Sequence, residues 1–194
     1  MKSKVLFFYF FLILSCFGVE DIFSQTDTEN SAACLIVINV QDHFTNDVLP
    51  PEKSAPVIGK INEIIGQTAP DEIIYVKSLV RVLSLTSDGT KVDTLPGMDF
   101  DKRLELINDE IFTKTKPDMF TCEELTSFLK SKRIKSITVV GFMANHSVYQ
   151  SCLGALKNGY KVSLIPDATL AGEEDDFNEI IGKLEKKGVM IQDR

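Results

Sequence analysis

The sequence predicts an α/β domain of three layers, in which helices cover both faces of a mainly parallel sheet. Two observations lead to this prediction. Short apolar runs alternate along the chain with segments whose apolar residues recur at helical spacing, a pattern typical of sheets built from βαβ units. The apolar runs are also nearly continuous, as strands are when both faces of the sheet are covered. The 194 residues are close to the length of one such domain.

Six apolar runs are the expected strands. The first reads ACLIVINV, with one polar residue near its end, and a later one reads SITVV. Their short length and their content of β-branched residues favour strands over helices. The expected strands span residues 33–40, 73–76, 111–114, 136–140, 160–165 and 189–191.

Helices are expected between these strands. Apolar residues at helical spacing follow Pro56, which would stand in the first turn of its helix. Thr121 and Glu124 have the spacing of a capping box, which predicts a helix start. Gly159 marks the end of a helix over 147–158, because glycine is favoured just after a helix. Further helices are expected around 100–107 and 177–184, and residues 82–101 are expected to form a long loop.

The N-terminus predicts export. Lys2 and Lys4 precede an apolar run over residues 5–19. This run is shorter than the roughly 20 residues of a membrane span and fits the hydrophobic region of a secretory signal. We therefore expect a signal peptide over residues 1–24, cleaved after Ser24.

A lipid anchor is the alternative to a free exported protein. The residues before Cys16 resemble a lipobox, in which the cysteine is acylated and holds the protein on a membrane. The protein is then either periplasmic or secreted, or a membrane-anchored lipoprotein, and the signal resembles those of Bacteroidetes-like bacteria. Residues 25–32 read as a polar linker and residues 33–194 as the folded domain.

Charge and cysteine content exclude several classes of function. The net charge is −7 and no basic cluster is present, so nucleic acid is not an expected partner, because phosphate binding needs Lys and Arg on one face. Beyond the signal, Cys34, Cys122 and Cys152 are an odd set without metal-ligand spacing. We expect Cys34 and Cys152 to be small core residues.

The alternation of strands and helices also predicts where a site would lie. In open parallel sheets, sites lie beyond the carboxyl ends of the strands, near the point where strand order reverses. This directs attention to three segments, namely residues 39–44, 114–120 and 141–147.

These segments carry a resemblance to a known family. The stretches LIVINVQDHF, FTKTKPDMF, VVGFMANHSV and ALKNGYKVSLIPDA resemble, in order and spacing, motifs of the isochorismatase-like superfamily of cysteine hydrolases. The likeness runs from about Ala33 to the C-terminus. It implies a Rossmann-like sheet, a small-molecule substrate or ligand, no cofactor, and a homo-oligomer.

The resemblance also assigns the catalytic positions. The family uses a Cys nucleophile, an Asp that takes its proton and a Lys that holds the charged pair. Carried over, the Asp becomes Asn39, the Lys remains as Lys114, and the Cys becomes Ser147. The oxyanion donors would be the backbone N–H groups of Ser147 and Met143. Further pocket residues would be Ala144, His146 and Phe44.

Two of the three catalytic side chains are therefore replaced. Asn39 cannot accept a proton as a carboxylate does, and a serine hydroxyl needs a base beside it. We expect a degenerate hydrolase, limited to small-molecule binding or weak hydrolysis of a C–N or ester bond. The alternative is an active amidohydrolase or esterase in which burial lowers the pKa of Lys114 so that it serves as the base for Ser147.

Several neighbouring residues leave alternatives open. Lys116 competes with Lys114 for the pocket, and the six-residue spacing to Phe120 favours Lys114. Asp42 could enter the pocket or remain a loop carboxylate. An apolar wall of the pocket, or ordinary packing, is expected of three residues in or near the 82–101 loop and the third strand: Met98, Phe100 and Met119.

No metal site is expected. His43 and His146 are the only histidines in the chain. Metal-binding relatives in this superfamily carry an Asp-x-His pair and a further histidine after the second strand. Nothing of that kind follows Tyr75.

Overall fold

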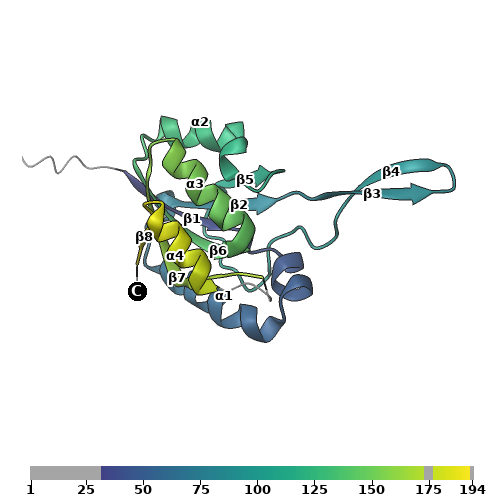
Figure 1. The fold of residues 1–194 in the computed structure, drawn as a ribbon, viewed down its shortest axis with the longest axis horizontal. Coiled ribbons are helices and arrows are strands. Elements are labelled where there is room, and N and C mark those ends of the chain that lie inside the picture. Colours follow the sequence, from purple (N-terminus) through teal and green to yellow (C-terminus); the bar gives the residue numbers. More distant parts are fainter. Residues whose placement is uncertain (1–31, 173–176, 193–194) are drawn as a thin grey trace, which may run out of the picture. The chain divides into compact units, whose positions relative to one another are not determined.

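A six-stranded sheet with helices on both faces forms the centre of the domain (Figure 1). The computed structural model describes residues 32–172 and 177–192. All neighbouring strands of the sheet are parallel, in the order β5-β2-β1-β6-β7-β8. The predicted three-layer α/β/α fold is therefore confirmed. The expected signal peptide and residues 25–31 of the expected linker lie outside the described residues.

Each expected strand is present, with small differences at the ends. The second strand runs two residues further than expected, to Ser78, and the fifth runs on to Leu170. The strands of the sheet are β1 (Ala33–Ile38), β2 (Ile73–Ser78), β5 (Ile111–Lys114), β6 (Ser136–Phe142), β7 (Lys161–Leu170) and β8 (Met190–Ile191).

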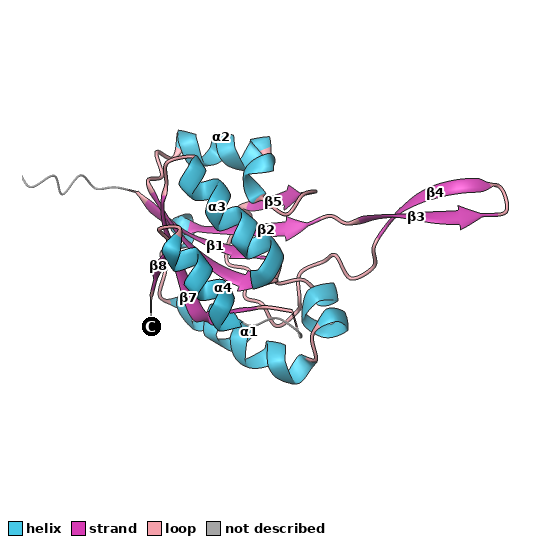
Figure 2. Cartoon of the chain, in the orientation of Figure 1, coloured by secondary structure: helices cyan, strands magenta, loops and turns pink. Residues whose placement is uncertain are grey.

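Within the described residues, four α-helices and four short helical turns connect the strands (Figure 2). The α-helices are α1 (Pro51–Gly66), α2 (Glu123–Ser131), α3 (Tyr149–Lys157) and α4 (Phe177–Lys186). Two π-helical turns, η1 (His43–Val48) and η4 (Ala144–Val148), follow β1 and β6. Two 3₁₀ turns, η2 (Pro70–Glu72) and η3 (Met119–Thr121), precede β2 and α2.

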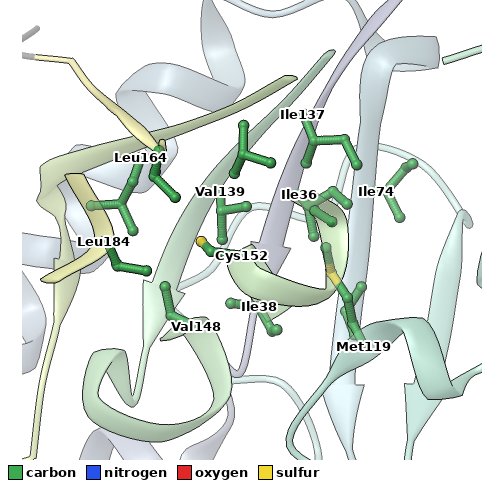
Figure 3. Close-up of a cluster of buried hydrophobic side chains, with 14 of the residues drawn as sticks. Ile36, Ile38, Ile74, Met119, Ile137, Val139, Val148, Cys152, Leu164 and Leu184 are labelled. Atoms are coloured by element: carbon green, nitrogen blue, oxygen red, sulfur yellow. The ribbon is translucent and has the colours of Figure 1, made fainter. Parts of the chain in front are cut away.

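The two faces of the sheet carry separate hydrophobic cores. Along β1, Ile36 and Ile38 face one core, while Leu35 and Val37 face the other, because successive strand residues point to opposite faces. Helices α2, α3 and α4 cover the first core, and α1 covers the second with residues such as Ile61. Figure 3 shows the first core, and its labelled side chains Ile36, Val139, Cys152 and Leu184 lie together. Both faces of the sheet are thus covered, which explains the continuous apolar runs.

The reversal of strand order places the site. Strand β1 pairs with β2 on one side and with β6 on the other. The chain therefore leaves β1 in one direction and returns on its opposite side, so that the ends of these strands frame a crevice. The polar residues that follow them meet there.

The expectation of a loop over 82–101 is wrong for most of that segment. Residues Arg81–Thr86 (β3) and Gly89–Thr94 (β4) form an antiparallel hairpin that extends away from the main sheet (Figure 1). Leu83 pairs with Val92 in its register, and the side chains of Leu83 and Leu85 are 75% and 90% exposed. The missed signal is the short alternation of β3 before a turn at Asp88.

The expected helix around 100–107 is also absent. Its backbone groups bond to other parts of the chain instead. The Asp101 carboxylate accepts from the backbone N–H of Arg103 at 2.9 Å, and the Asn62 side chain bonds both the Arg103 carbonyl and the Glu105 N–H, at 2.8 and 3.0 Å. Tyr75 donates its hydroxyl to the Glu105 carbonyl at 2.8 Å. Side chains that take up the backbone bonds in this way compete with a helix.

Two expected helix starts are placed differently in the structure. Helix α1 begins at Pro51, so Pro56 lies inside the helix rather than in its first turn. The capping box is wrong, because Cys122 is the N-cap of α2 and the Thr121 hydroxyl donates to the Asp118 carbonyl at 2.7 Å. The end of α3 is as expected, since Gly159 follows it with φ 83°.

Across residues 32–172 and 177–192, none of the helices combines the length and the apolar character that a membrane crossing requires.

Candidate active site

Four polar side chains meet at the carboxyl ends of the central strands. Asn39 follows β1, Ser78 ends β2, Lys114 ends β5 and Ser147 lies in η4 after β6. All four are buried. They come from four separate segments of the chain and are joined by hydrogen bonds, which marks this place as the candidate active site.

Lys114 lies at the centre of the cluster and is 2% exposed. Its Nζ donates to Ser78 Oγ at 2.7 Å, to Ser147 Oγ at 3.0 Å and to the Lys116 carbonyl at 3.3 Å. Burial lowers the pKa of Lys114 from 10.5 to about 8, and the nearby Asp118 carboxylate opposes this shift. A lysine with such a pKa is neutral for part of the time near neutral pH.

Asn39 connects to Lys114 through Ser78. The Ser78 hydroxyl donates to Asn39 Oδ1 at 2.8 Å. Asn39 has φ 58°, a left-handed conformation that asparagine tolerates better than most residues. Its Nδ2 is buried and has no hydrogen-bond partner among the described residues. A carboxylate at this position would leave no such donor unpaired.

Ser78 is the residue that the sequence analysis missed. Its backbone is held by Gln41, whose Oε1 accepts from the Ser78 N–H at 2.6 Å and whose Nε2 donates to the Ser78 carbonyl at 2.9 Å. The available signal was its place at the end of the second strand. The predicted strand ends at Val76, so its predicted carboxyl end does not include Ser78.

A sharp turn after β6 presents Ser147. Gly141 has φ 131°, and an added Cβ there would lie 2.0 Å from the Ile38 carbonyl oxygen, so β6 approaches β1 as only glycine allows. Met143 is left-handed, with φ 66° and ψ 55°. The turn η4 follows and carries Ser147, which is 5% exposed.

A cavity of about 210 Å³ opens onto Lys114 and Ser147. Its lining contains two lysines and no carboxylate, in a chain whose net charge is −7. The lining residues are Phe44, Ser78, Leu79, Val80, Lys114, Thr115, Lys116, Pro117, Met143, His146 and Ser147. The cavity is therefore small and locally cationic, and it is walled in part by apolar side chains.

The comparisons with known proteins agree with this architecture. The family model of the isochorismatase domain matches residues 33–194. The chain belongs to the isochorismatase family. Solved structures of isochorismatase-like hydrolases share its fold.

The chain is similar in sequence to curated isochorismatase family proteins from Dictyostelium discoideum. Isochorismatase family protein 2A is 30% identical over 88 residues, which are 44% of this chain and 44% of that protein. Isochorismatase family protein 1A is 25% identical over 168 residues, which are 83% of this chain and 74% of that protein. The chain thus aligns with under half of the first relative and about three quarters of the second.

A solved structure with the same fold is the pyrazinamidase of Pyrococcus horikoshii in complex with zinc. Its TM-score is 0.67 at 22% identity, and the match covers 84% of this chain and 99% of that chain. In the described part of this isochorismatase-family chain, no group of three or more His, Cys, Asp or Glu side chains could hold a metal. His43 instead lies 3.2 Å from Asp47.

The remaining predicted site residues separate into cavity and core. Phe44, Met143 and His146 line the cavity, whereas Ala144 is a buried residue of the first hydrophobic core. Lys116 lies exposed on the rim, and Lys114 is the lysine that contacts Ser147.

The residues with two interpretations take ordinary structural places. The Asp42 carboxylate accepts from Asn46 on η1 at 3.2 Å and is absent from the cavity lining. Met98 and Met119 are core residues on opposite faces of the sheet, and Phe100 packs against the core that contains Met98. Cys34 and Cys152 are buried core residues, as expected, and burial raises the pKa of each thiol to about 12.

Proposed function

We propose that this isochorismatase-family protein hydrolyses a small C–N or ester bond with Ser147 as nucleophile and Lys114 as its base. The observation that carries the proposal is the 3.0 Å separation between Lys114 Nζ and Ser147 Oγ. Hydrogen-bonding distance between a nucleophile and its base is the geometric requirement for this chemistry. The hydroxyl also faces a cavity that can admit a small substrate.

The lowered pKa of Lys114 supplies the base. With a pKa of about 8, about a tenth of the amine is neutral at pH 7. The neutral amine takes the proton of the Ser147 hydroxyl as Oγ attacks the substrate carbonyl. The resulting ammonium gives that proton to the leaving nitrogen or oxygen, and water then cleaves the acyl-serine in the reverse sequence. Backbone N–H groups at the turn of Met143 and Ser147 are the proposed oxyanion donors.

The replacement of Asp by Asn39 favours this route. An aspartate beside Lys114 would stabilise the ammonium and keep the amine from acting as a base. Asn39 is uncharged and reaches Lys114 only through Ser78. The amidase activity named for the Pyrococcus horikoshii relative supports a C–N bond as the first substrate class to test.

Ligand binding without turnover is the second candidate. It is favoured by the same pKa, because a group with a pKa of about 8 is mostly an ammonium at pH 7. The cavity has lysines and no carboxylate on its wall. A small carboxylate could therefore bind against Lys114 in a site that has lost its chemistry.

The first experiment measures hydrolysis of a panel of small amides and esters by the purified protein. Ser147→Ala and Lys114→Met are compared with the wild type, and Ser131→Ala serves as a matched control at the exposed end of α2. We expect activity in the wild type and the control and none in the two site variants. Full activity in Ser147→Ala would exclude the hydrolase mechanism.

The pH dependence separates the two candidates. For the hydrolase, kcat/KM rises with pH through about 8, because the neutral amine is the active form. For the binding protein, affinity for a small carboxylate falls over the same range, because the ammonium is the binding form. An Asn39→Asp/Ser147→Cys double variant that hydrolyses substrates beside an inactive wild type would support binding alone.

We also propose that the protein is exported and forms a homo-oligomer. The basic and apolar N-terminus supports the first proposal. The exposed leucines of the β3–β4 hairpin support the second, because a two-stranded hairpin is marginally stable alone in water.

A further inference from the structure

The hydrogen bonds around Lys114 have directions that can be worked out from their donors. Ser78 has a single hydroxyl proton, which it donates to Asn39 Oδ1 at 2.8 Å. Its oxygen must therefore accept from Lys114 Nζ, which lies 2.7 Å away. The Lys116 carbonyl, 3.3 Å from Nζ, can only accept. Two of the three neighbours of the amine thus require an N–H from it.

These hydrogen-bond directions determine where the lone pair of the neutral Lys114 amine lies. A neutral lysine amine has two N–H groups and one lone pair. If Ser78 and the Lys116 carbonyl take the two N–H groups, the lone pair remains for the third neighbour, the Ser147 hydroxyl at 3.0 Å. Ser147 then donates to Lys114, which is the direction that proton removal from Ser147 requires.

We infer that Ser78, with its proton committed to Asn39, is a positioning residue that turns the lone pair of the Lys114 amine toward the Ser147 hydroxyl. The inference rests on the proposed hydrolase function. It assigns a positioning role to Ser78 and makes Asn39 the acceptor of the Ser78 proton. The Asn39–Ser78 pair orients the Lys114 amine, as the aspartate of the family would, but without a negative charge.

The surroundings of Ser78 support a fixed orientation. Gln41 bonds both the N–H and the carbonyl of Ser78, at 2.6 and 2.9 Å, and Ser78 is buried. The ends of β1 and β2 are therefore tied together at this position. A hydroxyl whose backbone is held on both sides keeps its bonding direction, which a positioning role needs.

The charged groups near Lys114 are few. Asp118 acts on it electrostatically and raises its pKa against the larger effect of burial. Lys116 and His146 are the other titratable side chains on the cavity wall. Neither Asn39 nor Ser78 carries a carboxylate. A substitution in this pair is therefore expected to shift the pKa of Lys114 in a direction that can be predicted.

The test measures two properties of Ser78→Ala, Ser78→Thr, Asn39→Asp and the control Ser131→Ala. The first is the pH profile of kcat/KM on the best substrate of the wild type. The second is the titration midpoint of Lys114, followed by NMR of ¹³Cε-labelled lysine and assigned with Lys114→Met. The NMR measurement needs no activity, and thermal unfolding checks that each variant folds.

We expect opposite shifts in the two informative variants. Ser78→Ala lowers kcat by about 10- to 100-fold and moves the Lys114 midpoint to lower pH, because an acceptor that favours the ammonium is lost. Asn39→Asp moves the midpoint and the rising limb of kcat/KM to higher pH, because the new carboxylate favours the ammonium. Ser78→Thr retains the hydroxyl and restores most of the activity.

The outcomes separate this inference from the proposed function. The wild type could prove inactive while Ser78→Ala and Asn39→Asp still shift the Lys114 midpoint in opposite directions. That result would exclude the hydrolase function and would still show that the Asn39–Ser78 pair determines the protonation state of Lys114. The inference is overturned if Ser78→Ala keeps kcat within twofold, or if neither variant moves the midpoint. Asn39→Asp is nearly isosteric, so it keeps the test decisive if Ser78→Ala does not fold.

Discussion

At the scale of single residues, Lys114 is surrounded by uncharged hydrogen-bond partners. Asn39 carries no charge, and Ser78 supplies the oxygen that connects it to Lys114. Lys114 stays buried with three oxygen atoms within hydrogen-bonding distance and no bonded carboxylate among the described residues. Burial then dominates its pKa, which falls to about 8, and the same residue can act as base or as cation depending on pH.

The buried lysine also makes stability depend on pH. The Lys114 pKa is about 8 in the folded protein and 10.5 as the reference, so between these values the unfolded chain binds more protons than the folded one. The free energy of unfolding therefore rises with pH across this window, since the cost of a buried ammonium is present below it and relieved above it. The difference between a pKa of 10.5 and one of about 8 corresponds to about 3 kcal/mol.

Lys114→Met isolates this contribution. Relative to Lys114→Met, the wild type should gain up to about 3 kcal/mol of stability between pH 7 and pH 10.5. Urea unfolding of both proteins at several pH values measures the difference. Lys161→Met, at an exposed position on β7, should give a nearly constant difference from the wild type. A constant difference for Lys114→Met as well would contradict the burial effect.

At the scale of secondary-structure elements, the ends of the strands determine the site more than the strands themselves. The turn after β6 depends on Gly141, where an added Cβ would meet the Ile38 carbonyl at 2.0 Å and φ is 131°. This contact lies at the end of β1, directly before Asn39. A distortion there would displace Asn39 and Ser147 together.

Gly141→Ala should therefore destabilise the protein and reduce its activity. The strained φ and the clash with backbone are expected to cost more than about 2 kcal/mol. Gly59→Ala is the matched control, because nothing lies within 4 Å of the added methyl on helix α1, and it should stabilise by about 0.5–1 kcal/mol. Thermal unfolding of both variants measures this, and equal effects would show that the close approach is not required.

The strands and most helices could be predicted because burial on both sheet faces leaves continuous apolar runs. Lys114 and Ser147 were assigned from the resemblance to the family's motifs, in which the lysine precedes an aromatic residue by six positions and the nucleophile follows a buried strand. The helix around 100–107 was wrong because Asp101 and Asn62 bond its backbone, and such long-range bonds leave no periodic signal. Ser78 was missed because its role depends on Asn39 and Lys114, which lie 39 and 36 positions away.

At the scale of the whole molecule, the β3–β4 hairpin is a separate two-stranded sheet that is not part of the six-stranded sheet. Its Leu83 and Leu85 lie on one face of the hairpin, where they pair across the strands with Val92 and Thr90. Val92 on this face is 57% exposed. An exposed apolar face on a thin hairpin is typical of a surface covered in an assembly. The hairpin begins three residues after Ser78, and Leu79 and Val80, which precede it, line the cavity.

A Leu83→Glu/Leu85→Glu variant tests the homo-oligomer. We expect the wild type to form an oligomer by light scattering coupled to gel filtration and the variant to be a smaller species. The matched control is Ser84→Glu, which places its charge on the opposite face of the same strand because successive residues alternate, and it should keep the oligomer. A wild type that is monomeric at all concentrations would contradict the proposal.

The last prediction concerns export and the processing of the N-terminus. If residues 1–24 are removed, the mature chain begins at Gln25 and Cys16 is lost with the signal. If Cys16 is acylated instead, residues 16–24 remain and the protein sediments with membranes. The intact mass of the protein from its native host distinguishes these products. Cys16→Ala should abolish membrane association only in the second case, and an unprocessed chain in the cytoplasm would contradict both.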